Sequence, residues 1–284
     1  MSKLLDTVLL FSLPASGKSE VRKYLANLTP EQCRDEFHMG PTLQLDDYPY
    51  VHFMHRIDDE CYTAGGRYLF FKGPARPFQD PIQWFTLIEM LNEDYADLHA
   101  HKFYDVGSAA ELLFDRLDAA LLRAGAVPML QELPHKVRRA VAQALEAECR
   151  KELDGRNAQA QQDLTGKTIV IEAARGGPNG ATFPLTPPLG YAAAFSQLSP
   201  TILDRAGVLY VWVSPEESRR KNWERGRPDG QGSILFHSVP LEVMLGDYGC
   251  DDLAYLMQLS DQPDTVKVER TIQVPDGEGG MRYA

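Results

Sequence analysis

The residues best suited to chemistry lie near the start of the chain, directly after an apolar segment. Ser12-Leu-Pro-Ala-Ser-Gly17-Lys18-Ser19 fits the Walker A pattern GxxxxGK[ST], except that a serine replaces the first glycine. In such a loop, backbone N–H groups surround phosphate oxygens, the lysine binds the outer phosphates and the last hydroxyl binds Mg²⁺. We therefore predict an ATP and Mg²⁺ site whose nucleotide-binding residues are Ser12, Pro14, Ala15, Ser16, Gly17, Lys18 and Ser19, with Ser19 also a metal ligand.

The tripeptide occurs a second time, as Gly166-Lys167-Thr168. The first copy follows the apolar run Thr7–Phe11, typical of a strand buried on both faces, and precedes apolar residues at helical spacing. That order directs backbone N–H groups and a helix dipole at one point. The second copy precedes a strand, so it places no amides at a helix N-terminus. An ordinary turn with a solvated lysine is the alternative for the first copy, and it explains Gly17 but not the Gly-Lys-Ser order.

Carboxylates end two other predicted strands. Asp46 and Asp47 follow the segment that begins at Thr42, and Glu172 ends the apolar segment that begins at Thr168. Parallel strands end at one edge of a sheet, where α/β folds bind ligands. We expect Asp46 to be the catalytic base that accepts the proton of an attacking hydroxyl. Because neighbouring strand residues point to opposite faces, only one of the two aspartates is expected to face the site.

The remaining residues near these strand ends have more than one interpretation. A charge at the end of an apolar strand is costly unless it is solvated, paired or bound to metal, so Glu172 is predicted to bind metal or substrate. Asp47 is predicted to bind a substrate hydroxyl or, through water, the metal, and Tyr48 to stack on a substrate ring. The alternatives are an acidic turn before Pro49 and an aromatic residue of the core.

Several arginines are candidates for phosphate contacts. Arg225 and Arg227 follow a predicted helix in a glycine-rich segment, and they are expected to close over the transferring phosphate as a catalytic lid. Arg220 is expected to pair with Glu216 on that helix. Arg175 lies in a glycine-rich loop and is predicted to bind substrate or phosphate, with a plain surface arginine as the alternative.

These segments resemble the P-loop kinases that phosphorylate small molecules. Leu45-Asp46-Asp47-Tyr48 is similar to a segment of the uridine kinase and phosphoribulokinase group whose first aspartate acts as the base. Ile169–Ala173 is similar to that group's third-strand segment, which ends with an acidic residue near metal and substrate. Glu224-Arg225-Gly226-Arg227 resembles the arginine-bearing lid of this group and of deoxynucleoside kinases. The resemblance lies in short pieces, so it implies a P-loop kinase but does not indicate the substrate.

The predicted elements alternate between strands and helices, which is typical of a parallel α/β sheet. We expect one P-loop kinase-like domain over residues 1–284, a three-layer P-loop NTPase fold with a mainly parallel five-stranded sheet. Its last strand is expected at the edge, over Thr265–Val274. A helical insertion at about 80–163 is expected between the second and third strands, with its last helix stopped near Gly155 and a surface connector after it. The sequence shows no internal repeat.

The composition is that of an ordinary globular protein, with 44% hydrophobic and 24% charged residues. Forty acidic and 29 basic residues give a net charge of −11, which argues against nucleic acid as a partner. The four cysteines form no CxxC pair, and no apolar run approaches the roughly 20 residues that a membrane span needs. The N-terminus has no signal-peptide pattern, so we expect a cytoplasmic protein without a membrane partner.

The sequence thus predicts an ATP- and Mg²⁺-dependent phosphotransferase that moves the γ-phosphate of ATP to a small-molecule acceptor, with a nucleoside as one candidate. Two alternatives stay open. One is a zeta-toxin-type kinase, which also has an aspartate after its second strand. The other is a nucleotide-binding module that switches conformation without turnover. Neither the acceptor nor the oligomeric state follows from the sequence.

Overall fold

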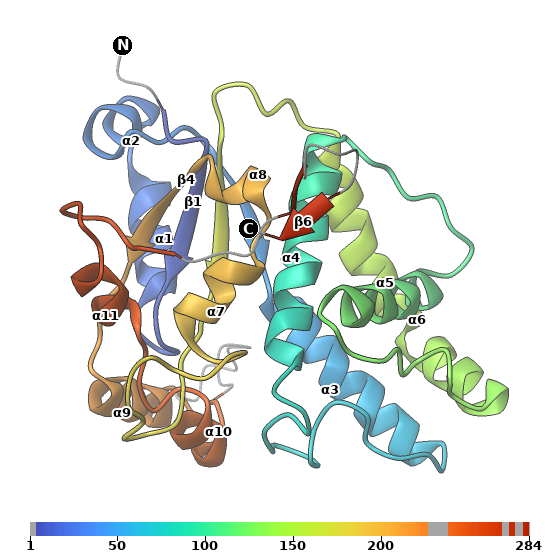
Figure 1. Cartoon of the computed structure of the whole chain (residues 1–284). Coiled ribbons are helices and arrows are strands. Elements are labelled where there is room, and N and C mark those ends of the chain that lie inside the picture. The colour runs from blue at the N-terminus through green and yellow to red at the C-terminus, as the bar shows by residue number, and fades with distance from the viewer. Residues whose placement is uncertain (1–3, 227–237, 269–272, 276–280, 284) are drawn as a thin grey trace.

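The protein folds around a parallel sheet. The computed structural model describes residues 4–226, 238–268, 273–275 and 281–283. In the described part, four parallel strands form one sheet in the order β2-β3-β1-β4 (Figure 1), and they are β1 (Thr7–Phe11), β2 (Thr42–Asp46), β3 (Thr168–Ala173) and β4 (Ala206–Tyr210). The predicted α/β class and parallel sheet are therefore confirmed. The carboxyl ends of the strands meet at one edge, which is where the loops after β1, β2 and β3 lie.

The predicted fifth strand of this sheet, over Thr265–Val274, is wrong. Residues 265–268 form no strand, and residues 269–272 lie outside the described part of the chain. β5 (Gln273–Pro275) pairs antiparallel with β6 (Met281–Tyr283) in a separate two-stranded sheet. Val266 and Val268 pack against the core that α11 (Leu253–Gln258) helps to form. An extended segment with one buried side shows the same alternation of apolar residues as a strand.

Helices cover both faces of the sheet. Alternate residues of β1 face opposite sides: Leu10 packs with α1 (Lys18–Asn27) and α2 (Pro30–Phe37), whereas Leu9 packs with the helices of the other face. Those helices are α4 (Gln83–His99), α7 (Gly190–Gln197) and α11. Burial on both faces explains why β1 is continuously apolar. The remaining helices on the carboxyl-terminal half are α8 (Pro200–Leu203), α9 (Pro215–Arg225) and α10 (Leu241–Gly246).

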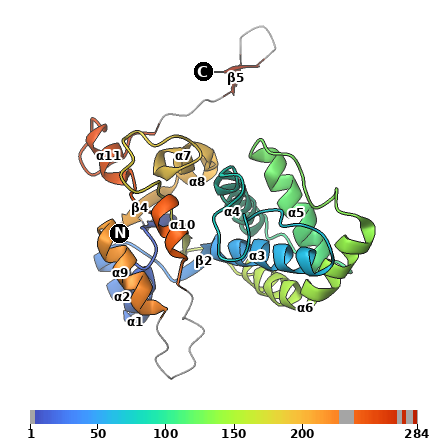
Figure 2. The same ribbon diagram turned by 90° about the horizontal axis from the view of Figure 1, so that it is seen from below.

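Four helices lie between β2 and β3. They are α3 (Tyr48–Thr63), α4, α5 (Ala109–Arg123) and α6 (His135–Ala160), and Figure 2 shows α3, α5 and α6 to one side of the sheet with α4 next to it. α5 begins after Ser108, whose Oγ accepts a hydrogen bond from the Glu111 amide. The sequence pattern gives no sign of α3. Pro49 marks the end of a strand there, but proline fits equally well in the first turn of a helix.

α6 is longer than the sequence predicts. It continues through Gly155 to Ala160, so the expected surface connector begins as helix. Arg156 lies on its buried side, where its guanidinium pairs with Asp94 (2.6 Å) and Asp97 (3.4 Å) of α4. Tertiary ion pairs therefore override the low helix propensity of Gly155, which costs about 1 kcal/mol relative to alanine.

α3 and α5 carry the same local device, although the sequence shows no obvious repeat. Asp58 accepts hydrogen bonds from backbone amides 11, 12 and 13 residues later, and Asp118 does so from amides 11, 12 and 13 residues later as well. Gly65 and Gly125, with φ of 85° and 86°, end the two helices before those amides. The two helices and the loops that follow them therefore share this pattern of hydrogen bonds.

Within the described residues, no helix combines the length and the apolar character that crossing a bilayer requires.

Candidate functional site

The loop after β1 leads directly into α1, as the sequence predicts. Ala15 has φ 55° and Gly17 has φ 109°, so the chain turns twice through the left-handed region between Ser12 and Lys18. Gly17 is the N-cap of α1, and no side chain caps this helix. The first N–H groups of a helix have no partners within it, and together with the helix dipole they form an anion site. The start of α1 therefore presents open donors at the carboxyl edge of the sheet.

Ser12, which replaces the first glycine of the pattern, is a structural part of this loop. It is fully buried and is not among the residues with positive φ, so a serine fits its backbone conformation. Its Oγ accepts hydrogen bonds from Lys18 Nζ (2.8 Å) and from Ser16 Oγ (2.5 Å), and it donates to the Leu13 carbonyl (2.9 Å). The serine hydroxyl thus holds the lysine ammonium over the loop.

α9 supports the same loop from outside. Ser218 Oγ donates to the Pro14 carbonyl (2.7 Å), and Ser218 is fully buried. One turn later, Asn222 bonds both the amide and the carbonyl of Val239 (2.8 and 2.7 Å). α9 is therefore fixed between the loop that precedes α1 and the segment before α10. No motif in the sequence singles out Ser218 or Asn222, because their partners are backbone groups that are distant in the chain.

Strand register brings two carboxylates together. Asp46 at the end of β2 is the register partner of Glu172 in β3, and Glu172 is in turn the partner of Leu10 in β1. Leu10 faces α1, so both carboxylates lie on the α1 side of the sheet. Glu172 is held there by Arg22 Nη1 of α1 (3.2 Å) and by Gln44 Nε2 (3.3 Å).

The electrostatic surroundings link these residues to Lys18. Burial lowers the pKa of Lys18, and the carboxylates of Glu172, Asp47 and Asp46 oppose that shift. Burial, together with the neighbouring charges of Asp47 and Glu172, raises the pKa of Asp46 to about 7. The Tyr48 amide donates to Asp46 Oδ1 (2.9 Å) and partly opposes the rise. Asp46 is thus poised to exchange a proton near neutral pH.

The charges of both aspartates act on Lys18. The alternation of strand side chains does not apply to Asp47, because it is the N-cap of α3 with helical dihedrals (φ −82°, ψ −12°). Asp47 Oδ2 pairs with Arg175 Nη1 at 2.6 Å. Arg175 is 2% exposed, which excludes the interpretation of a plain surface arginine. Tyr48, by contrast, is 55% exposed at the first residue of α3.

The predicted lid is only partly within the described residues. Arg225 lies exposed in the last turn of α9, whereas Arg227 lies outside the described part of the chain. Arg220 pairs with Glu217 (2.6 Å) and Glu224 (2.5 Å) instead of with Glu216. Arg220 is therefore engaged on its own helix, as predicted, but with different partners.

The donor set at this edge fits a phosphate-bound Mg²⁺ better than a protein-only metal site. Among the described residues, no group of three or more His, Cys, Asp or Glu side chains is arranged to hold a metal ion. Mg²⁺ usually keeps several waters and takes one or two protein ligands beside substrate phosphates. The Ser19 hydroxyl in the first turn of α1 and the carboxylate of Glu172 are the residues here that would hold it.

The second copy of the tripeptide lies at the opposite edge of the sheet, at the start of β3. Lys167 Nζ donates to Gln162 Oε1 (2.7 Å). Thr168 is fully buried; its Oγ1 donates to the Leu5 carbonyl (2.7 Å) and accepts from the Gly40 amide (3.0 Å). These contacts fix the amino ends of strands and leave no open helix terminus, so the second copy is structural.

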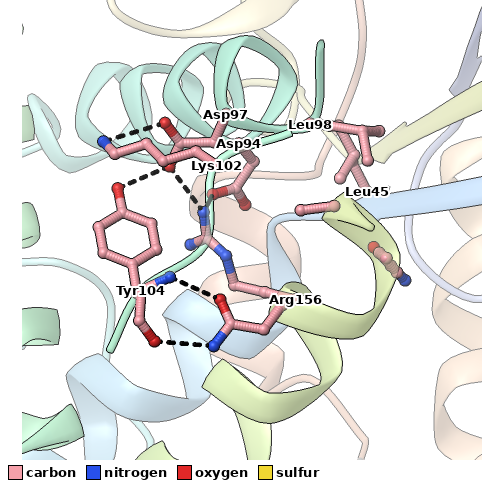
Figure 3. A pocket seen from close by; sticks show the side chains of 10 residues that line it. Leu45, Asp94, Asp97, Leu98, Lys102, Tyr104 and Arg156 are labelled. Carbon is pink, nitrogen blue, oxygen red and sulfur yellow. Dashed lines mark hydrogen bonds and ion pairs between the residues drawn. The ribbon is translucent and has the colours of Figure 1, made fainter. Parts of the chain in front are cut away.

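A small cavity of about 20 Å³ lies on the other face of β2 (Figure 3). Leu45, which lines it, precedes Asp46 and therefore points away from the α1 side. Its charged lining groups already pair with one another: Lys102 with Asp97 (3.2 Å), and Arg156 with Asp94 (2.6 Å). This cavity has the size of a water molecule, and it belongs to the contact between α4 and α6 instead of to the phosphate loop.

The chain matches no protein-family model, and it has no significant match among curated proteins.

Proposed function

We propose that this protein is an ATP- and Mg²⁺-dependent kinase that transfers the γ-phosphate of ATP to a hydroxyl or phosphate of a small molecule. The observation that carries the proposal is the position of Lys18 at an uncapped helix start, beside two carboxylates that strand register brings to the same edge. Phosphoryl transfer requires positioning, charge neutralisation and a proton acceptor, and these residues have the chemistry for each.

The phosphate loop supplies the binding part of this proposal. Backbone N–H groups from Ala15 to Ser19 would bind the phosphate oxygens, and Lys18 would move from Ser12 Oγ to the outer phosphates. A bound Mg²⁺ would neutralise charge that develops on the transferring group. Ser19 and Glu172 would orient it, because Ser19 lies in the first turn of α1 and Glu172 is the next-to-last residue of the paired strand β3.

Asp46 supplies the proton acceptor. A carboxylate with a pKa near 7 takes a proton from a hydroxyl more readily than one with an ordinary pKa near 4. Because this pKa is about 7, Asp46 is still ionised at slightly alkaline pH. Arg225, exposed at the end of the helix that holds the loop, would approach the phosphates from outside.

The test is phosphoryl transfer from ATP labelled at the γ-phosphate, measured with Mg²⁺ across a panel of nucleosides, sugars and small alcohols together with their phosphorylated or acidic counterparts. We expect at least one labelled acceptor, and we expect MgATP to raise the melting temperature, since a ligand of the native state stabilises it by mass action. A thermal shift without transfer to any acceptor would contradict the kinase and favour the conformational switch. Absence of both would contradict the nucleotide site itself.

A further inference from the structure

Arg175 has donors that the rest of the site does not use. Its Nη1 bonds both Asp47 Oδ2 (2.6 Å) and the Ala174 carbonyl (2.6 Å). Among the described residues, neither its Nε nor its Nη2 has a hydrogen-bond partner, and both atoms are buried. Leaving a buried charged donor unpaired costs more free energy than leaving a neutral donor unpaired, so such a group calls for an explanation.

The two free nitrogens lie along the same edge of the guanidinium. Nε–H and Nη2–H point in parallel from that edge and match the spacing of two oxygens in a carboxylate or phosphate. Trp84 lies beside the group, with its ring centroid 5.1 Å from Cζ. An aromatic face offsets part of the charge, but it is a weak acceptor compared with an oxyanion. The unused edge therefore has the geometry of an oxyanion site.

Arg175 contacts the residue that follows the proposed base. Arg175 follows β3 by two residues, and its partner Asp47 directly follows Asp46 in the chain. The charge of Arg175 also lowers the pKa of Lys18, which places the two cations in the same electrostatic environment. A molecule held by Arg175 would thus lie beside the base and not in the helix-start position where the nucleotide phosphates belong.

The segment Asp247–Cys250 covers this region. The Gly177 amide donates to the Cys250 carbonyl (2.9 Å), and a Cβ on Gly176 would lie 2.4 Å from that oxygen, so the two segments are in direct backbone contact. Tyr248 packs on Trp84 with ring centroids 5.5 Å apart. Trp84 thus contacts both Tyr248 and the Arg175 guanidinium.

We infer that the phosphoryl acceptor carries an oxyanion, a carboxylate or a phosphate, which binds the Nε and Nη2 edge of Arg175 and so positions the reacting hydroxyl beside Asp46. The inference rests on the proposed kinase activity and narrows its substrate class. It excludes neutral nucleosides and sugars as the best acceptors and favours their phosphorylated or acidic counterparts.

The experiment compares matched ligands in wild-type protein saturated with MgADP, so that the phosphate loop is already filled. The ligands are glycerol, glycerate and glycerol 3-phosphate, together with uridine and uridine 5′-monophosphate. We expect concentration-dependent increases in melting temperature from anionic members and none from neutral ones. The carboxylate and phosphate members distinguish the two kinds of oxyanion. Equal shifts from neutral and anionic members, or no shift from any, would overturn the inference.

Variants locate the effect. Arg175→Lys keeps the charge but loses the two-donor edge, so the anionic ligand should bind about 10- to 100-fold more weakly while MgADP still raises the melting temperature. Arg205→Lys is the control, because Arg205 is an exposed arginine that also pairs with an aspartate, Asp6. Wild-type affinity in Arg175→Lys would overturn the inference. If MgADP did not raise the melting temperature of the wild type, the kinase proposal itself would be contradicted. The two failures are therefore distinguishable.

Discussion

Two copies of one tripeptide lie at opposite edges of the same sheet. Gly17-Lys18-Ser19 follows β1 and begins α1, whereas Gly166-Lys167-Thr168 precedes β3. At the first copy the helix start has no side-chain cap, and the lysine lies among carboxylates. At the second copy the threonine hydroxyl forms hydrogen bonds with backbone groups of two other segments. The same residue types thus serve as a candidate ligand site in one place and as a strand anchor in the other.

The difference follows from chain direction. In a parallel sheet, the residue after a strand reaches the edge where other strands also end, so Lys18 meets Asp46 and Glu172. A residue that precedes a strand lies at the other edge of the sheet. The two edges are separated by the length of the strand, which rises about 3.3 Å per residue. A short motif therefore predicts chemistry only together with the elements on either side of it.

The largest expected effect separates the two lysines. If Lys18 neutralises the transferring phosphate, Lys18→Ala should lower kcat/KM about 10³-fold and remove most of the MgATP-induced increase in melting temperature. Lys167→Ala removes only a hydrogen bond to Gln162 and should change neither quantity. Both variants are compared with wild type by initial rates and thermal unfolding. Similar losses in both variants, or in neither, would show that the comparison between the copies is wrong.

The sequence predicts the first copy and its neighbours well because the signals there are local. An apolar strand, the tripeptide and a helical pattern follow one another, and the acidic ends of β2 and β3 reach the same edge through ordinary parallel pairing. These features depend on chain order and side-chain periodicity alone.

The parts that the sequence does not predict depend on distant partners. Arg175 looks like an ordinary loop arginine until Asp47 and Trp84 are brought to it, and Ser218 has no visible role until α9 meets the Pro14 carbonyl. α6 continues past a glycine because Arg156 forms ion pairs with aspartates of α4. Ion pairs and hydrogen bonds between segments leave no periodic pattern, so they appear only in three dimensions.

The second effect concerns the base at the edge of the first copy. Asp46→Asn should lower kcat about 10²-fold with little change in nucleotide affinity, which is the scale of a positioned proton acceptor. In wild type, kcat/KM should rise with pH through about 7, because Asp46 must lose its proton before it can accept one. Asp163→Asn, close to the second copy, serves as the control, and rates are measured from pH 5 to 9.

The ionisation of Asp46 also affects stability, but in the opposite direction: the rate should rise with pH, whereas stability should fall. The folded-state pKa of Asp46 lies above the ordinary value of 3.8, so ionisation between about pH 4 and pH 7 costs free energy of folding. Asp46→Asn should therefore raise the melting temperature at pH 8 more than at pH 5. A pH-independent rate in wild type, together with a melting temperature that Asp46→Asn leaves unchanged, would exclude Asp46 as the titrating base.

A smaller effect is expected for the arginine on α9, an element that supports only the first copy. Arg225→Ala should lower kcat and kcat/KM together by about tenfold while acceptor binding changes little, if Arg225 contacts the phosphates mainly in the transition state. Arg220→Ala should have less effect, because Arg220 already pairs with Glu217 and Glu224. Initial rates at varied acceptor concentration measure both. A greater loss in Arg220→Ala would contradict the assignment of Arg225.

The smallest effects are expected at Thr168 and Ser19, the hydroxyl residues of the two copies. We expect the first substitution to change stability and the second to change the Mg²⁺ requirement. Thr168→Val keeps the shape of a fully buried side chain but leaves the Leu5 carbonyl and the Gly40 amide without their partner, which should lower the free energy of unfolding by about 1–3 kcal/mol. Turnover per folded molecule should stay unchanged, since this residue is at the amino edge of the sheet. Ser19→Ala should do the reverse, because Ser19 lies in the first turn of α1 and its hydroxyl is the expected Mg²⁺ ligand. Its melting temperature without nucleotide should match wild type, and the Mg²⁺ concentration for half-maximal activity should rise several-fold. Chemical denaturation and Mg²⁺ titration of the two variants side by side make the comparison. A stability loss in Ser19→Ala with an unchanged Mg²⁺ requirement would mean that both hydroxyls only hold the fold together.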